Sequence, residues 1–508
     1  MATTTLWGFT IGVLSREEAA EEFFGKATLW ISNNFTWFYT LTQNAWIFVV
    51  IFVLFRKRYA NIKLGQPDDR PDYSDLVWFT LIFTTGLGTG IFYFGVSEPM
   101  YYYRDDSKLL GTATNYIAKI PFMNDDQRAN MAMFVTFLHW GLHGWATYIL
   151  VALTLGVVHY RLGRPLTLRS AFYPIVGDYV NGLFGDLIDS MSIACTTFGL
   201  CTSLGLGASS INTILHRMSA SIPDDDDNTK SAIIWGITAL TTGALVSGLH
   251  RGVITFAIVA FSILLALIMI LFMLDNTWYL ANSFTQQIGT YLQYVILGGF
   301  DNDAIAQLNI DSPTSFMDTW TVFYWAWWIT WAPFVGMFYA KISRGRTIRS
   351  LILVGMFAPM FLGFFAISVL GSLGIRMQRI AELALGAAPD WQKGVVNCGA
   401  LGYLENTPPY KNLTTLLQTL VLLGVILFFV TSADAGAFVD DKIAANGMEN
   451  PPVLQKVWWS ITQGATAQAL LSSTKNGLST LQSVSICAAL PYTFALNYMC
   501  VALFRAMD

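Results

Sequence analysis

Long apolar stretches recur along the chain and are separated by shorter polar segments. A helix needs about 20 predominantly apolar residues to cross a bilayer, and runs of this length favour membrane spans over buried core helices. The pattern predicts eleven spans, at residues 35–55, 76–103, 131–158, 184–213, 231–248, 252–275, 318–340, 349–373, 411–439, 453–471 and 478–504. The chain is therefore expected to be an all-α polytopic membrane protein.

One segment between the spans has a different pattern. Residues 282–300 place apolar side chains at helical spacing, with polar residues between them. This segment is too polar to span and predicts an amphipathic helix at the membrane interface. The chain then divides into an N-terminal segment with the first full span (1–75), a first half (76–275), the interfacial helix and loop (276–317), and a second half (318–508).

Composition and charge agree with a protein of the bilayer. Of the 508 residues, 54% are hydrophobic and 12% are charged, about half the charged fraction of a typical soluble domain. The net charge of −4 gives no reason to expect a nucleic-acid partner. Residues 1–14 lack a basic start and a small-residue cleavage site, so no removable signal peptide is expected. A multi-pass protein of the plasma membrane is predicted.

Basic residues cluster in two of the short loops. Arg56, Lys57 and Arg58 close the first span, and the loop after the 318–340 span carries Lys341, Arg344, Arg346 and Arg349. If the spans alternate in direction, both loops fall on the same side of the membrane. Basic short loops favour the cytoplasmic side, so we expect both clusters inside the cell.

Two spans have unusual sequences. The 76–103 span contains Gly86, Gly88 and Gly90 in alternation, and 318–340 contains five tryptophans and Pro333. Glycine costs about 1 kcal/mol relative to alanine inside a helix, so the first of these helices should be broken. Interrupted helices at matching positions of two halves point to a transporter's binding site near the midplane. The alternative is that the glycines only permit close helix packing.

The tryptophans of the 318–340 span share one side of the helix. At about 100° per residue, one arc of about 100° contains Trp320, Tyr324, Trp327, Trp328 and Trp331, while Trp325 points away. A second aromatic sector, of about 140° by the same geometry, contains Trp140, Trp145 and Tyr148. Two facing aromatic sectors could form a cage for a quaternary ammonium cation. The alternatives are a bulky core helix or an interfacial aromatic belt.

The stretch that contains the second sector could instead bind a metal ion. His139 and His143 are four residues apart, a spacing that can hold a metal ion. No Asp or Glu accompanies them in this stretch, and packing or backbone-bonded histidines are the favoured interpretation. Signatures of membrane-embedded enzymes such as G-x-S-x-G and H-E-x-x-H are absent, so we expect no enzyme activity.

Five motifs together resemble the betaine–choline–carnitine transporter family. They are "WTVFYWAWWITWAPFVGMFYAKISRGRTIR" (320–349), "GLGTGIFYFGVSEP" (86–99), "HWGLHGWATY" (139–148), "SLGLG" (203–207) and "FFVTSADAG" (428–436). The resemblance implies two inverted five-helix repeats, a homotrimer, and secondary transport of trimethylammonium-type solutes without an organic cofactor. It also implies that the first family helix is missing or truncated, because it should end near residues 1–14.

The resemblance also assigns roles to particular residues. It places Trp327, Trp328 and Trp331 in the substrate site, together with the second cluster, Trp140, Trp145 and Tyr148. Backbone amides of Gly86, Gly88 and Gly90 would hold a substrate carboxylate. The coupling ion would be Na⁺, bound by main-chain and hydroxyl oxygens of Thr84, Leu87, Phe428, Thr431 and Ser432. The alternative for the two hydroxyls is hydrogen bonding within their own helix.

One departure from the family concerns a second sodium site. Sodium-coupled members use two threonines there, and this chain has Thr196 at one position but Leu200 at the other, with Phe334 retained. A second site, and a two-sodium stoichiometry, are therefore in doubt.

The glycine stretch itself favours a class of substrate. In the family, proton-coupled choline carriers tend to place an acid there, and sodium-independent carnitine exchangers tend to lose the third glycine. Here residues 86–90 read G-L-G-T-G. We therefore expect sodium-coupled import of a zwitterion such as glycine betaine or dimethylsulfoniopropionate. A choline or carnitine transporter, proton-coupled or exchanging, is the alternative, and an onium-binding sensor is the alternative of another class.

Overall fold

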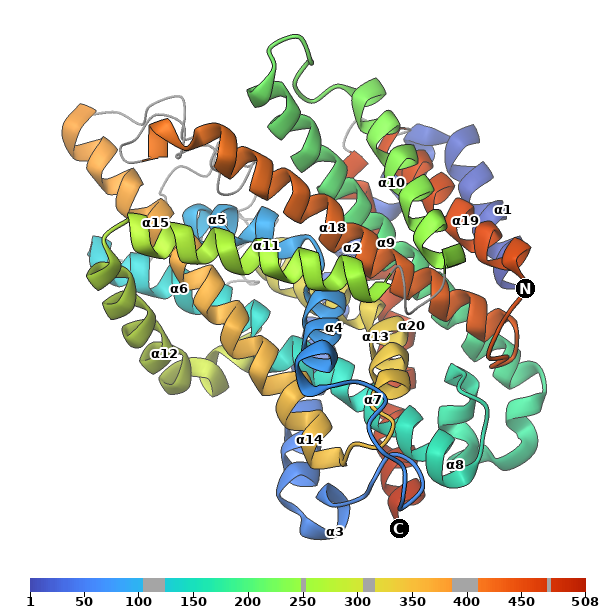
Figure 1. Ribbon diagram of the computed structural model, residues 1–508. Coiled ribbons are helices and arrows are strands. Elements are labelled where there is room, and N and C mark those ends of the chain that lie inside the picture. The colour runs from blue at the N-terminus through green and yellow to red at the C-terminus, as the bar shows by residue number, and fades with distance from the viewer. Residues whose placement is uncertain (104–123, 248–252, 305–315, 386–409, 473–476) are drawn as a thin grey trace.

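The computed structural model describes residues 1–103, 124–247, 253–304, 316–385, 410–472 and 477–508, and the regular elements of these segments are helices (Figure 1). The longer ones are α2 (Glu17–Phe55), α4 (Asp75–Leu87), α5 (Gly90–Tyr103), α6 (Asp125–Trp140), α7 (Leu142–Leu162), α9 (Leu183–Met218), α10 (Asp227–Ser247), α11 (Val253–Leu274), α12 (Thr277–Gly299), α13 (Val322–Ile342), α15 (Ala358–Leu385), α18 (Thr414–Ala444), α19 (Val453–Ser472) and α20 (Gly477–Met507). The N-terminal helix is α1 (Ala2–Ser15), and short elements include α3 (Lys57–Ala60), α8 (Tyr173–Val176) and α14 (Ile348–Ile352).

Within the described residues, each of the eleven predicted spans is helical. Most correspond to one helix or to two consecutive helical elements, and the 349–373 span covers α14, a π-helical turn (Leu353–Phe357) and α15. In the described part of the chain, seven helical segments are long and apolar enough to cross a membrane, or eight if the bent pair α4 and α5 forms one span. The remaining three predicted spans, in α10, α13 and α19, are helical but less apolar. For α13 the reason is visible in its packing: nearly every residue is buried against other helices. A helix that is surrounded by protein can carry tryptophan and hydroxyl-bearing residues that would be unfavourable in contact with lipid.

The predicted break in the glycine-rich span is confirmed. Helix α4 ends at Leu87, α5 begins at Gly90, and the two axes differ in direction by 55°. Gly88 lies between them with φ +57°, a left-handed conformation that glycine adopts without a side-chain clash. The helical ladder is therefore interrupted at the position that the three glycines indicate.

The broken helix lies next to the tryptophan-rich helix in the interior. Helix α13 packs against α7, α9, α18 and α20 and also contacts α4, and Figure 1 shows it in the middle of the helices. Helices α6 and α7 are separated only by Gly141, so the second aromatic cluster also sits at a helix junction. Both aromatic clusters and the glycine break are thus brought to one region of the core.

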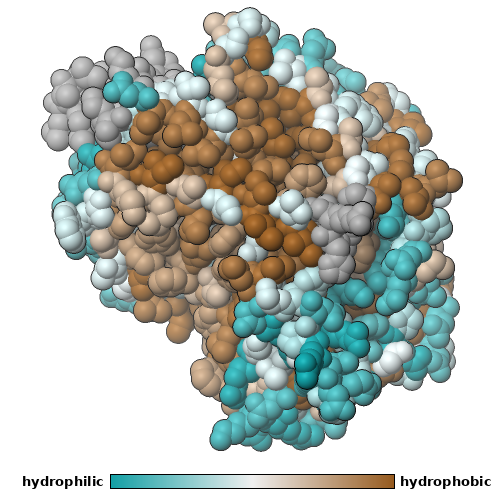
Figure 2. Space-filling view, in the orientation of Figure 1, coloured by the Kyte–Doolittle hydropathy of each residue, from teal (hydrophilic) through white to brown (hydrophobic). Residues whose placement is uncertain are grey.

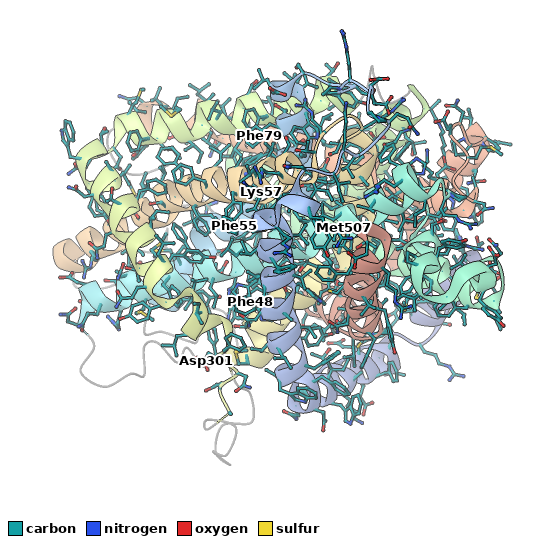
Figure 3. The ribbon with its side chains drawn as sticks, turned by 90° about the horizontal axis from the view of Figure 1, so that it is seen from below. Phe48, Phe55, Lys57, Phe79, Asp301 and Met507 are labelled. Atoms are coloured by element: carbon teal, nitrogen blue, oxygen red, sulfur yellow. The ribbon has the colours of Figure 1, made fainter. Side chains whose placement is uncertain are left out.

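The outer surface carries a broad apolar area. Along α2, Phe48 is 59% exposed and Phe55 is 76% exposed, and Figure 3 shows both on this helix, with Lys57 immediately beyond its end. Figure 2 shows a wide hydrophobic area over the upper helices and a hydrophilic region below it. Such a face is expected of a surface that contacts lipid.

The two basic loops lie at the same end of the molecule, as predicted. Lys63 and Thr347 form an antiparallel β-bridge, supported by main-chain hydrogen bonds from Leu64 N to Arg346 O (2.8 Å) and from Gly345 N to Leu64 O (2.7 Å). Arg344 also donates to both carboxylate oxygens of Asp69, at 2.9 and 3.2 Å. This hydrogen bond from the guanidinium holds the pKa of the Asp69 carboxyl below its usual range.

Helix α1 occupies the part of the chain where the truncated first family helix was expected. It has 14 residues, too few for a full span, and packs on α19 through Trp7 and Thr10. Trp7 Nε1 donates to Thr462 Oγ1 at 3.2 Å, and the hydroxyls of Thr10 and Thr466 are 3.0 Å apart. The segment predicted as an amphipathic helix is also helical, and α12 begins five residues earlier than expected, at Thr277.

Candidate functional site

A small cavity lies where the break between α4 and α5 meets α6, α7 and α13. Its volume is about 10 Å³, and its lining consists of Gly86, Leu87, Trp140, Tyr148, Trp327, Trp328 and Trp331. A space of this size holds about one water molecule. A trimethylammonium group is larger, so the rings must separate to admit one.

The rings of the cavity are arranged edge to face rather than stacked. Trp140 makes angles of 87° with Trp327 and 76° with Trp328, with centroid distances of 6.1 and 5.9 Å. Tyr148 lies 4.9 Å from Trp328, and Trp327 lies 5.9 Å from Trp331 at 77°. Mutually inclined rings present several π-faces to one point. This is the arrangement that attracts a cation without hydrogen-bond donors.

The glycines of the break make room for these rings. A Cβ on Gly88 would lie 2.3 Å from the ring of Trp331, and a Cβ on Gly90 would lie 2.5 Å from Trp140 and 2.8 Å from Trp327. The predicted role of these glycines was to free backbone amides for a carboxylate. The structure adds a steric role: any larger residue would push the aromatic rings out of the cavity.

Most of the indole N–H groups are anchored outside the cavity. Trp328 donates to the main-chain oxygen of His139 at 2.9 Å, and Trp331 donates to that of Gly199 at 3.1 Å. The Trp327 N–H, however, is buried and has no hydrogen-bond partner among the described residues. The hydroxyl of Thr89, in the break itself, is also buried and without a hydrogen-bond partner among the described residues. Trp327 lines the cavity and Thr89 lies in the adjacent break, so these two unpartnered groups are candidates for contact with a polar group of a ligand.

Three of the predicted aromatic residues do not line the cavity. Trp145 is one layer behind it, with its N–H on the main-chain oxygen of Trp140 at 3.1 Å and its ring against Gly86. Trp320 packs on Tyr101 and Tyr102, with centroid distances of 4.8 and 5.2 Å. Tyr324 stacks on His139 at 4.4 Å. They support the residues of the cavity rather than face it.

Glu98 is the residue that the sequence interpretation missed. Its side chain is fully buried in α5, and it accepts hydrogen bonds from Trp140 Nε1 (2.9 Å), Tyr324 OH (2.6 Å) and Tyr102 OH (3.0 Å). Its Oε1 is also 2.7 Å from His139 Nδ1. No acid accompanies His139 in its own stretch of sequence, and the structure supplies one from a different helix.

The structure does not bring the two histidines to one metal ion. The Nε2 atom of His143 is 3.2 Å from Asn44 Oδ1, and its ring stacks on Trp325 at 4.9 Å. Within the described ranges, no group of three or more His, Cys, Asp or Glu side chains is placed to hold a metal. The packing role expected for these histidines fits His143, whereas His139 contacts the side chains of Glu98 and Thr321.

The predicted sodium ligands lie around the contact between α4 and α18. Ser432 Oγ is 3.5 Å from the main-chain oxygen of Thr84, so the two helices meet at this point. Leu87 ends α4 and also lines the aromatic cavity. Thr431 donates its hydroxyl to Leu427 O within its own helix at 2.8 Å, and Phe428 is buried against Phe92 with centroids 5.4 Å apart.

At the possible second sodium site, Leu200 fills the position of the missing hydroxyl. A Cβ on Gly436 would lie only 2.2 Å from Cδ1 of Leu200, so the leucine packs directly on this glycine. Thr196 is fully buried, and its hydroxyl has no partner among the described residues. Phe334 is retained and packs on Trp331 at 5.2 Å. The leucine methyl groups and the glycine thus fit each other and leave apolar surface where an oxygen ligand would be required.

A larger cavity of about 270 Å³ lies beyond the Glu98 network. Its lining includes Phe134 and Leu138 from α6, Tyr294 from α12, and Asp301, Asp303 and Thr321. Figure 3 shows Asp301 below α12, near the start of the loop that follows this helix. Thr321 Oγ1 is 3.0 Å from His139 Nε2. The larger cavity and the aromatic cavity are therefore linked by one chain of polar contacts through Thr321, His139 and Glu98.

An all-α polytopic fold with a broken helix beside an aromatic cavity defines a membrane transporter. The chain belongs to the BCCT family, the betaine/carnitine/choline family of transporters, which it matches over residues 1–508.

Individual relatives cover most of the chain as well. It is 34% identical to the glycine betaine transporter OpuD of Bacillus subtilis over 100% of this chain and 92% of that protein. It is 34% identical to a glycine betaine transporter of Acinetobacter baylyi over 94% and 68%, and 30% identical to a glycine betaine/proline/choline transporter of Vibrio parahaemolyticus over 98% and 87%.

Proposed function

We propose that this protein is a sodium-coupled symporter that imports a zwitterionic onium solute, such as glycine betaine or dimethylsulfoniopropionate. The observation that carries the proposal is the set of inclined rings around the cavity, with Trp140 edge to face with both Trp327 and Trp328. Each ring contributes about 0.5–2 kcal/mol to binding of a desolvated cation. Sulfonium and quaternary ammonium groups are both cations without donors, and both suit such a site.

Two features support a zwitterion over a simple cation. None of the described residues that line the aromatic cavity is an acid, and Glu98 lies behind Trp140, from which it accepts a hydrogen bond. The unpartnered N–H of Trp327 and the hydroxyl of Thr89 offer donors to a carboxylate. A substrate with a cationic head and an anionic tail satisfies both the rings and these donors.

Sodium coupling is supported by the contact between the break and α18. Sodium is a hard cation that prefers several oxygen ligands, which unwound backbone and hydroxyl groups supply in transporters of this kind. Leu87 belongs both to the predicted ion site and to the cavity lining. An ion bound there would hold the broken helix in the conformation that binds the substrate, which couples the two ligands. The packing of Leu200 on Gly436 favours one sodium ion rather than two.

Choline is the second candidate substrate. An osmo-dependent choline transporter of Acinetobacter baylyi is 30% identical over 98% of this chain and 69% of that protein. Choline carries a cationic head without a carboxylate, so it would engage the rings but leave the donors of Trp327 and Thr89 unsatisfied. A homotrimer is proposed from the family resemblance.

Uptake into proteoliposomes tests the proposal directly. Labelled glycine betaine, dimethylsulfoniopropionate, choline and carnitine are offered with an inward gradient of sodium, of protons, or of neither. Accumulation of a zwitterion that requires sodium is expected. Accumulation of choline alone, or uptake driven by protons or by exchange without sodium, would contradict the proposed substrate class and coupling ion respectively.

A further inference from the structure

Four side chains contact the oxygens of Glu98, and its side chain is fully buried. Trp140 and Tyr324 donate to Oε2, while Tyr102 donates to Oε1, which also lies 2.7 Å from His139 Nδ1. The described part of the chain gives Glu98 no Lys or Arg partner. The indole N–H of Trp140 can only donate, so Glu98 meets it as an acceptor.

His139 links Glu98 to Thr321. Its Nδ1 lies 2.7 Å from Glu98 Oε1, and its Nε2 lies 3.0 Å from the hydroxyl oxygen of Thr321. Both ring nitrogens therefore have a side-chain partner. Tyr324 stacks on the ring with centroids 4.4 Å apart. The network of Glu98, His139, Tyr102, Trp140, Tyr324 and Thr321 thus places a carboxyl group in the protein interior.

Trp140 lies between the carboxyl group of Glu98 and the aromatic cavity. One edge of the indole donates its N–H to Glu98, and the ring lines the cavity opposite Trp327 and Trp328. Hydrogen bonds in a low-dielectric interior polarise the groups they join. A carboxylate on the N–H therefore makes the π-face of this indole more negative, and the charge itself acts across the ring at a distance where interior electrostatics are strong.

The same network fixes the positions of the rings. Trp140 and Tyr324 bind one oxygen of Glu98, so α6 and α13 are joined through α5. The main-chain oxygen of His139 anchors Trp328. Two of the tryptophans that line the cavity are thus held by Glu98 or by the residue that it binds. Glu98 lies in α5, ten residues beyond Gly88, so these hydrogen bonds connect the helix that follows the break to the rings of the cavity.

We propose that Glu98 is a positioning residue that also sets charge selectivity: it orients Trp140 and Tyr324 and gives the cavity its preference for a cationic head over a neutral head of the same shape. The inference rests on the proposed function, because it assumes that the onium group binds among these rings. It goes further because it assigns the preference for a cationic over a neutral head to the buried carboxylate of Glu98, which does not touch the substrate.

A pair of isosteric ligands separates charge from shape. Glycine betaine and 3,3-dimethylbutanoate have the same outline and the same carboxylate, but the second has a carbon in place of the cationic nitrogen. The measurement is the inhibition constant of each against uptake of labelled betaine by the full chain in proteoliposomes, with intrinsic tryptophan fluorescence as an independent binding readout. The wild-type protein is expected to prefer betaine by a factor of about 10 or more.

Glu98→Gln removes the charge and keeps the size of the side chain. Betaine is expected to bind about tenfold more weakly, and the neutral isostere to change by less than about threefold, so that the preference collapses. Glu98→Asp should restore the preference to within about threefold of wild type, even if both ligands bind more weakly. Tyr102→Phe is the matched control, because it removes one donor from the network and leaves the charge in place.

Equal weakening of both ligands in Glu98→Gln would show that Glu98 acts on ring position alone, and the selectivity proposal would be overturned. If Glu98→Gln does not fold, Glu98→Asp decides the question: a lost preference in the folded aspartate variant contradicts a role for the charge, and a kept preference supports it. If the wild-type protein binds neither ligand, the onium site itself is wrong, and that failure is distinct from the failure of Glu98.

Discussion

Gly88 and Trp331 are in direct contact, and a single added carbon at Gly88 would lie 2.3 Å from the indole ring. The contact joins the break of one helix to the aromatic face of another. Because Gly88 also has φ +57°, a side chain there is strained for two separate reasons, one in the backbone and one in the packing.

Gly88→Ala is therefore expected to lower uptake of the onium substrate about tenfold or more, through about 1–2 kcal/mol of backbone strain and displacement of Trp331. The measurement is initial uptake together with the melting temperature of the purified protein. Gly236→Ala is the control, since a Cβ there meets no atom within 4 Å, and it should leave uptake unchanged. Normal uptake in Gly88→Ala would show that the rings tolerate movement at this contact.

Trp328→Leu tests the cage. The leucine removes a π-face and the donor to His139 O, so the apparent affinity for betaine should fall about tenfold or more, which corresponds to about 1–2 kcal/mol. Trp325→Leu provides the comparison, because Trp325 lies on the same helix but packs on His143. It should lower the melting temperature without a comparable loss of affinity. Equal affinities in the two variants would contradict a cage at Trp328.

Thr431→Ala with Ser432→Ala tests the sodium ligands. If these hydroxyls bind Na⁺, the sodium concentration for half-maximal uptake should rise by about tenfold or more, since a site with few waters loses two oxygens. Betaine affinity at saturating sodium should change less, because the aromatic residues are untouched. Thr419→Ala is a control on the same helix, where the hydroxyl also bonds within the helix, at 2.7 Å. An unchanged sodium dependence would exclude both hydroxyls as ligands.

The packing of Leu200 on Gly436 makes a prediction about stoichiometry. Uptake as a function of sodium concentration should give a Hill coefficient near one in the wild-type protein. In Leu200→Thr a hydroxyl is restored beside Thr196 and Phe334, and the coefficient should move toward two. A wild-type coefficient near two would mean that another residue replaces the missing hydroxyl.

Local features of the sequence were sufficient to predict the helices, the break at Gly88 and the approach of two aromatic clusters. Helical periodicity and glycine conformation act over a few residues, so they can be seen in the sequence. The arc of tryptophans was partly misleading, because Trp320 lies in a π-helical turn, Met317–Thr321, in which a spacing of 100° per residue no longer applies. The helical arc therefore placed Trp320 with residues that line the cavity, although it lies behind it. Tyr324 lies in the regular helix α13, and it is drawn away from the cavity by its contacts with Glu98 and His139.

The role of Glu98 could not be predicted from nearby residues. Its donors His139, Trp140 and Tyr324 are 41, 42 and 226 residues away in the sequence. The helix break decides which way α5 points, and this direction brings the carboxylate to them. An acid in an apolar span does suggest that partners exist elsewhere, and that signal was present in the sequence at residue 98.

The main-chain pairing between residues 62–64 and 345–348 has a mechanical consequence. Together with the bond from Ile348 N to Ile62 O at 2.9 Å, it makes three hydrogen bonds between the loop before α4 and the loop after α13. Separating these loops would cost about 3 kcal/mol at about 1 kcal/mol for each bond. A rocking motion that opens the aromatic cavity to alternate sides of the membrane therefore costs the least free energy if these two loops stay together as a pivot. The displacement would then grow toward the far ends of α4 and α13.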